Sequence, residues 1–112
     1  MSELVVKAAY ASVTEVEGEG FVGFVDAREE NYALFRQPLA GGPVWFEVND
    51  EDFGAEDAIA ALALAEGSLT VTLRPERIGR FGYASRVAIR LKSCEGAEPA
   101  LARLRAMGLL AP

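Results

Sequence analysis

Residues 59–73 read Ile-Ala-Ala-Leu-Ala-Leu-Ala-Glu-Gly-Ser-Leu-Thr-Val-Thr-Leu, and the interpretation of this segment decides the fold class. The alanine-rich residues 55–66 have helical propensity, so a helix is one reading of the first half. The second half alternates apolar residues with threonine, which is typical of a half-buried strand. Glu66-Gly67, between the halves, has the form of a tight hairpin turn. We therefore predict a strand over residues 59–65 that pairs with a strand over residues 69–73.

Working outward, the same alternation of apolar and polar residues recurs along most of the chain, between turns rich in glycine and proline. Near the C-terminus, Pro99 suits the first turn of a helix, Leu101 and Leu104 form an apolar stripe, and Gly108 is placed to end it. The expected strands cover residues 4–16, 21–26, 32–36, 44–48, 59–65, 69–73 and 86–92, and the expected helix covers residues 97–107. The predicted fold is α+β, a mostly antiparallel six- or seven-stranded sheet with one C-terminal helix packed on it.

The composition is that of one globular domain over residues 1–112. Hydrophobic residues make up 51% of the chain and charged residues 25%, as in ordinary globular proteins. No apolar run approaches the roughly 20 residues that span a bilayer, so we expect no membrane partner. The N-terminus lacks the pattern of a signal peptide, and the single Cys94 excludes an internal disulfide. These features favour a cytoplasmic location.

Charge is distributed unevenly along the chain. Residues 1–73 hold 3 basic and 14 acidic side chains, whereas residues 74–112 hold 8 basic and 3 acidic ones. The acidic first part argues against nucleic acid as a partner, because it would repel phosphates. The basic second part is either the internal counter-charge of the fold or an anion site.

Six carboxylates and no Lys or Arg lie between Glu47 and Asp57. Such a cluster requires water, a cation or a basic partner to relieve its repulsion. The EF-hand calcium loop does not fit, because Gly54 is the fifth residue from Asp50 and Ala61 the twelfth. A solvated loop, a looser calcium site and a protein contact remain as readings of this acidic run.

Trp45 and Glu47 are expected on one face of the strand over residues 44–48, opposite Val44, Phe46 and Val48. If that face is exposed, an aromatic residue beside carboxylates is a suitable interface anchor. The alternative places Trp45 in the core. The predicted protein-binding residues are Trp45, Glu47, Asn49, Asp50, Glu51, Asp52, Glu56 and Asp57.

The sequence contains few of the residues that commonly carry out catalysis. The chain has no histidine, which removes the usual general base near neutral pH. Cys94 follows the last predicted strand and is read as a small structural residue. Arg77 and Arg80, which accompany glycines at 79 and 82, lack the spacing of a phosphate-binding loop. We therefore expect no enzyme activity, no catalytic residue, no cofactor and no metal.

The ordered segments Tyr32-Ala33-Leu34-Phe35-Arg36-Gln37, Trp45-Phe46-Glu47-Val48-Asn49-Asp50, Ile59-Ala60-Ala61-Leu62-Ala63-Leu64 and Leu69-Thr70-Val71-Thr72-Leu73 occur in this sequence. This set resembles the immunity protein 10 family of bacterial polymorphic toxin systems over about residues 20–110. Glu47, Asn49 and Asp50 match the Glu-x-Asn-Asp-Gln element of that family, and Glu51 stands where glutamine is usual.

The resemblance implies a cytoplasmic protein that neutralises a cognate protein toxin by stoichiometric binding. The acidic run supplies a separate physical reason, since it could occupy a basic substrate cleft of a toxin and accelerate association. Two alternatives involve no catalysis. One is a homo-oligomeric module, such as a homodimer, in which the acidic and basic parts of neighbouring chains pair. The other is a domain that binds a small ligand or a cation.

Overall fold

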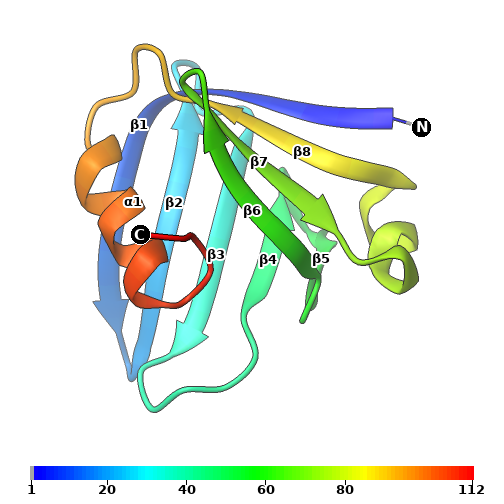
Figure 1. The fold of residues 1–112 in the computed structure, drawn as a ribbon, viewed down its shortest axis with the longest axis horizontal. Helices are drawn as coiled ribbons and strands as arrows, with labels where there is room; N and C mark the ends of the chain where they lie inside the picture. The colour runs from blue at the N-terminus through cyan, green and yellow to red at the C-terminus, as the bar shows by residue number, and fades with distance from the viewer. Residues whose placement is uncertain (1) are drawn as a thin grey trace.

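The computed structural model describes residues 2–112, and within them eight strands form one sheet in the order β5-β4-β3-β2-β1-β8-β7-β6 (Figure 1). Neighbouring strands are antiparallel except β1 and β8, which are parallel. The elements, in chain order, are β1 (Ser2–Val16), β2 (Glu19–Asp26), β3 (Tyr32–Pro38), β4 (Trp45–Val48), β5 (Asp50–Glu56), β6 (Ile59–Ala65), β7 (Ser68–Leu73), the 3₁₀ helix η1 (Pro75–Phe81), β8 (Ala84–Arg90) and α1 (Ala97–Ala106).

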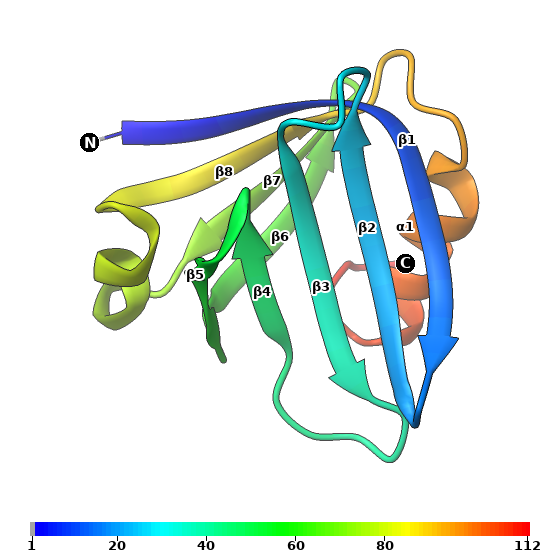
Figure 2. The same cartoon turned by 180° about the vertical axis from the view of Figure 1, so that it is seen from behind.

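Strand β1 joins two halves of the sheet. Its first part, up to Lys7, pairs with β8, and its second part, from Ala8 onward, pairs with β2. The register shifts between Ala8 and Tyr10, where the strand changes partners. The strand bends along its length, so that β2–β5 and β6–β8 lie in two halves that face each other (Figures 1 and 2).

The hydrophobic core fills the space between these halves. The fully buried side chains include Val22, Phe24, Phe35 and Phe46 from β2–β4, Leu69, Val71, Val87 and Ile89 from β7 and β8, and Leu104 from α1. Four phenylalanines form a continuous series through it. Their ring centroids are 6.2 Å apart for Phe24 and Phe35, 4.8 Å for Phe35 and Phe46, and 5.8 Å for Phe46 and Phe81.

Helix α1 is attached to β1 by backbone and side-chain contacts. The Ala11 amide donates to the Glu95 carbonyl at 2.7 Å, just before the helix begins. Gly96 has φ 82°, and a Cβ there would lie 2.4 Å from the Ala11 carbonyl oxygen, so this close approach requires glycine. Closer to the C-terminal end of β1, Arg103 of the helix contacts Glu15 at 2.5 Å.

The expected mostly antiparallel sheet with a C-terminal helix is confirmed, and residues 59–65 form the predicted strand β6 rather than a helix. The expected number of six or seven strands was too low. The additional strand is β5, where the solvated-loop reading of the acidic run placed no strand. β5 forms because a tight turn at Asn49 returns the chain onto β4, and only one of its edges needs a partner.

Two smaller differences concern the chain before and within the last strand. Between the expected strands over residues 69–73 and 86–92 the sequence predicts no helix, but η1 lies there and buries Phe81. The last strand begins at Ala84 and ends at Arg90, two residues earlier than expected at each end. Across residues 2–112, no helix has the length and apolar character needed to cross a membrane.

Candidate functional site

The acidic run forms a hairpin of β4 and β5 at one edge of the sheet. Asn49 makes the turn and has φ 69°, a conformation that asparagine tolerates better than most residues. Its amide donates to the Tyr32 carbonyl at 3.0 Å, and its Oδ1 accepts the Tyr32 amide at 2.9 Å. Asn49 therefore holds the hairpin turn against the beginning of β3.

Trp45 and Glu47 share the outer face of β4, as predicted, while Phe46 and Val48 point into the core. The two side chains are hydrogen-bonded to each other. The Trp45 Nε1–H donates to Glu47 Oε1 at 2.6 Å, and the Tyr32 hydroxyl donates to Glu47 Oε2. Glu47 is only 7% exposed. Two predicted contact residues thus form an internal cluster with Tyr32.

Tyr32 is kept protonated by its surroundings. Burial raises the pKa of Tyr32 above its ordinary value, and its hydrogen bond to Glu47 raises it further. The negative charges of Glu47, Asp50 and Glu51 act in the same direction, because a tyrosinate beside them would be repelled. The phenol therefore remains a hydrogen-bond donor to Glu47.

The indole of Trp45 is half-buried, so the residue is neither a core side chain nor a freely exposed anchor. It lies over Gly54 of β5, where a Cβ would be 2.7 Å from Trp45 Cζ2 and 2.8 Å from the Glu47 Cβ. Glycine is required at 54 for this reason. The Arg36 guanidinium lies 5.3 Å from the centre of the indole ring, within cation–π range, and its Nε is 3.3 Å from Glu19.

Three carboxylates at the tip of the hairpin face solvent. Asp50, Glu51 and Asp52 are exposed, and within residues 2–112 none of them forms an ion pair with a basic side chain. Asp50 Oδ1 accepts the Asp52 amide at 2.8 Å, which shapes the start of β5. Glu56, at the far end of β5, is also exposed and has no ion pair in that part of the chain. These four carboxylates are called the acidic surface below.

Asp57 is separate from the acidic surface. It lies at the corner between β5 and β6 with φ 54°, and its Oδ1 is 3.4 Å from the Arg74 Nε. The Arg74 Nε–H has no hydrogen-bond partner in the structure, so the contact is an ion pair without hydrogen-bond geometry. The basic second part of the chain therefore neutralises Asp57.

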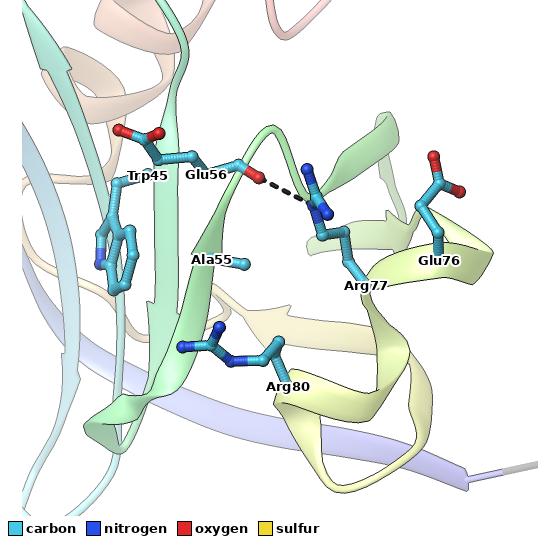
Figure 3. Close-up of a pocket in the computed structure, with 6 residues that line it drawn as sticks. All are labelled: Trp45, Ala55, Glu56, Glu76, Arg77 and Arg80. Atoms are coloured by element: carbon cyan, nitrogen blue, oxygen red, sulfur yellow. Dashed lines mark hydrogen bonds between the residues drawn. The ribbon is translucent and has the colours of Figure 1, made fainter.

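An open cleft of about 440 Å³ lies between β5 and η1 (Figure 3). The Arg77 Nε–H donates to the Glu56 carbonyl at 3.1 Å and so covers the free edge of β5. Arg80 extends from η1 toward β5. The cleft is lined by Trp45, Ala55, Glu56, Glu76, Arg77 and Arg80. Two arginines and two glutamates give it no net charge, which does not favour the anion cradle considered for Arg77 and Arg80.

The acidic side chains are not arranged as a metal site. In the part of the chain that the structure describes, no three His, Cys, Asp or Glu side chains are grouped so as to hold a metal ion. Burial raises the pKa of the Cys94 thiol, which keeps it protonated and poorly nucleophilic.

Comparison of the chain with protein-family models, curated proteins and solved structures found no match to any of them.

Sequence reasoning missed two residues of this region, Tyr32 and Gly54. Tyr32 lies 15 residues before Glu47, and only the pairing of β3 with β4 brings them together. Gly54 is opposite Glu47 in the ladder. The single available signal was a glycine within an otherwise acidic segment, which marks close approach of another side chain once the segment is known to be a strand.

Proposed function

We propose that this chain is a toxin-immunity protein, related to the immunity protein 10 family, that neutralises a basic protein toxin in the cytoplasm by stoichiometric binding. It acts without catalysis, cofactor or metal. The acidic surface of Asp50, Glu51, Asp52 and Glu56 meets the cationic cleft of the toxin.

One observation carries this proposal: the charges of the acidic surface are not neutralised by the chain itself. Asp57, Glu3, Glu15 and Glu19 each lie against an arginine, whereas the four carboxylates of the acidic surface have no such ion pair within residues 2–112. Uncompensated like charges on one hairpin lower stability slightly, so their concentration supports a role outside the fold.

The surrounding residues support a rigid contact surface. Asn49 joins the hairpin turn to β3, and Trp45 and Glu47 are fixed through Tyr32. A surface that is ordered before binding loses less entropy in the complex. Trp45, Glu47 and Asn49 therefore position the acidic surface, and the exposed part of the indole lies at its border.

Electrostatic attraction of this kind acts mainly on the association rate. Opposite potentials raise the rate constant from about 10⁵–10⁶ M⁻¹s⁻¹ toward 10⁸–10⁹ M⁻¹s⁻¹ at low salt. Salt screens the attraction over a Debye length of about 10 Å at 0.1 M. Fast, salt-sensitive association suits a protein that must intercept a toxin before it reaches its target.

The test first looks for a gene for a secreted toxin immediately upstream of the gene for this chain, and then co-expresses the toxic domain that it encodes with this chain in bacteria. Wild-type chain is expected to restore growth and to bind the domain in a one-to-one complex. The variant Asp50→Asn/Glu51→Gln/Asp52→Asn should bind at least about tenfold more weakly, mostly through slower association, with a flatter salt dependence.

The control variant Glu17→Gln/Glu95→Gln/Glu98→Gln makes the same change in net charge at exposed positions outside the hairpin. It should protect as well as wild type. Equal protection by the two triple variants would place the contact elsewhere, and failure of the wild-type chain to protect would contradict the immunity function itself.

A further inference from the structure

The free edge of β6 is apolar and exposed. β6 is the last strand in the sheet order, and its sequence, Ile-Ala-Ala-Leu-Ala-Leu-Ala, contains no charged residue and no proline. The alanines at 60, 61, 63 and 65 are exposed, and Leu64 is 39% exposed. An unprotected strand of this kind offers its backbone N–H and C=O groups to another strand.

The opposite edge of the same sheet is protected. β5 carries the four carboxylates of the acidic surface, and Arg77 covers the Glu56 carbonyl. Charged residues and side-chain caps are the usual means of preventing strand addition. Because one edge is protected in this way and the other is not, β6 is distinguished as a pairing edge.

The hairpin turn determines which groups β6 presents. Glu66 (φ 53°) and Gly67 (φ 75°) form a two-residue turn with positive φ at both positions, and Ala65 lies opposite Ser68. In such a hairpin the pair next to the turn is hydrogen-bonded, and bonded pairs alternate along the ladder. Ala63 and Ala65 therefore bond to β7, while Leu62 and Leu64 direct their N–H and C=O groups to the free edge.

We propose that β6 pairs with β6 of a second copy of this chain, antiparallel and centred on Ala63. In this register Leu62 of each copy lies opposite Leu64 of the other. Both leucines have outward-directed backbone groups, so the two Leu62–Leu64 pairs form four intermolecular hydrogen bonds. The two sheets then continue into each other, and the four leucine side chains meet on the core-facing side of the strands.

The strand is complementary to itself, and this favours a second copy over a different protein. A two-fold axis places two identical edge strands antiparallel, as the register requires. The uncharged strand has no groups that would select a basic partner such as a toxin. In this register Glu66 lies opposite Ala60 of the other copy, which is about three residues from Asp57 of that copy. The acidic residues that flank the two strands therefore do not face each other.

The contact is small. Pairing of one strand from each copy buries less than the roughly 1,200 Å² of a standard stable interface. A reversible dimer with a micromolar or weaker dissociation constant is therefore expected. The acidic surface lies on the other edge strand, so each dimer carries two of them, and the dimer does not depend on the proposed immunity function.

Sedimentation velocity over a concentration series tests the dimer. The wild-type sedimentation coefficient should rise with concentration toward that of a dimer. Ala63→Lys places two ammonium groups directly opposite each other and should keep the chain monomeric at every concentration. Ala102→Lys, at an exposed position of α1, is the matched control and should behave as wild type. A wild-type chain that stays monomeric, or a dimer that survives Ala63→Lys, would overturn the proposal.

Cross-linking tests the register in a Cys94→Ala background. Opposed Ala63 residues form a non-hydrogen-bonded pair with Cα atoms about 4.5 Å apart, within the range of a disulfide. Ala63→Cys should therefore form a covalent dimer on mild oxidation. The two Ala65 residues would be about 13 Å apart, so Ala65→Cys should not cross-link. Equal cross-linking of the two variants, or none by Ala63→Cys, would contradict pairing centred on Ala63.

Discussion

The role assigned to Glu47 differs between the sequence and the structure. In the sequence it belongs to a run of carboxylates and was predicted to face a partner. In the structure it is 7% exposed and accepts hydrogen bonds from Trp45 and Tyr32. A carboxylate buried this far is tolerated because both oxygens have donors. Its role is to fix the indole and the phenol on the outer face of β3 and β4.

Tyr32 provides a prediction about alkaline pH. The native state raises the pKa of Tyr32, so above about pH 10 the unfolded chain loses this proton more readily than the native chain does. The stabilisation that the protonated Tyr32 hydroxyl contributes is fully present below about pH 10 and is lost as the pH rises above it. Urea unfolding at several pH values should show a decline above about pH 10 that is smaller in Tyr32→Phe than in wild type.

Tyr10→Phe removes the hydroxyl group of a half-exposed tyrosine and serves as the control for the loss of one tyrosine that titrates. It should retain the wild-type decline. If Tyr32→Phe and wild type lose stability in parallel through this range, the hydroxyl is not held by Glu47 in solution.

At the scale of the element, β5 shows what strand pairing can impose on an unfavourable sequence. Asp, Glu and Gly are depleted in strands, yet residues 50–56 pair with β4 as far as Glu56. Its apolar Ala55 faces the core, and its carboxylates remain in water. The Arg77 contact with the Glu56 carbonyl satisfies one group of its free edge.

Replacement of Arg77 tests that contact. Arg77→Ala should lower the free energy of unfolding by about 1 kcal/mol, the usual net contribution of one hydrogen bond, and increase amide hydrogen exchange in β5. Arg80→Ala is the matched control from the same 3₁₀ helix, and its effect should stay within about 0.5 kcal/mol. Equal effects of the two variants would show that the Arg77 contact does not hold the edge.

Period-two alternation predicted most of the sheet because each of those strands buries one face. β6 was predicted correctly because the turn Glu66-Gly67 follows it and leads into a clearly alternating strand. β5 was missed because it is held by backbone pairing and by the turn at Asn49, neither of which leaves an apolar pattern. The shared face of Trp45 and Glu47 followed from alternation, whereas their contact with Tyr32 depends on the order of strands in space, which local sequence does not specify.

At the scale of the whole molecule, helix α1 completes the core between the two halves of the sheet. Leu104 is fully buried, and Leu101 is 5% exposed. Leu104→Ala should lower the free energy of unfolding by about 2–5 kcal/mol, measured by urea unfolding followed through Trp45 fluorescence.

Leu39→Ala makes the same chemical change at a side chain that is 52% exposed and should have little effect. A small effect of Leu104→Ala would mean that the sheet is stable without the helix packed against it.

The long first strand also has a consequence for synthesis. Residues 2–7 leave the ribosome well before residues 84–90, which form their parallel neighbour β8. Pairing across so long a sequence separation is slow to form, because the intervening loop must close first. During synthesis residues 2–7 therefore remain without their β8 partner until residues 84–90 have also emerged, so the joint between the two halves of the sheet forms late.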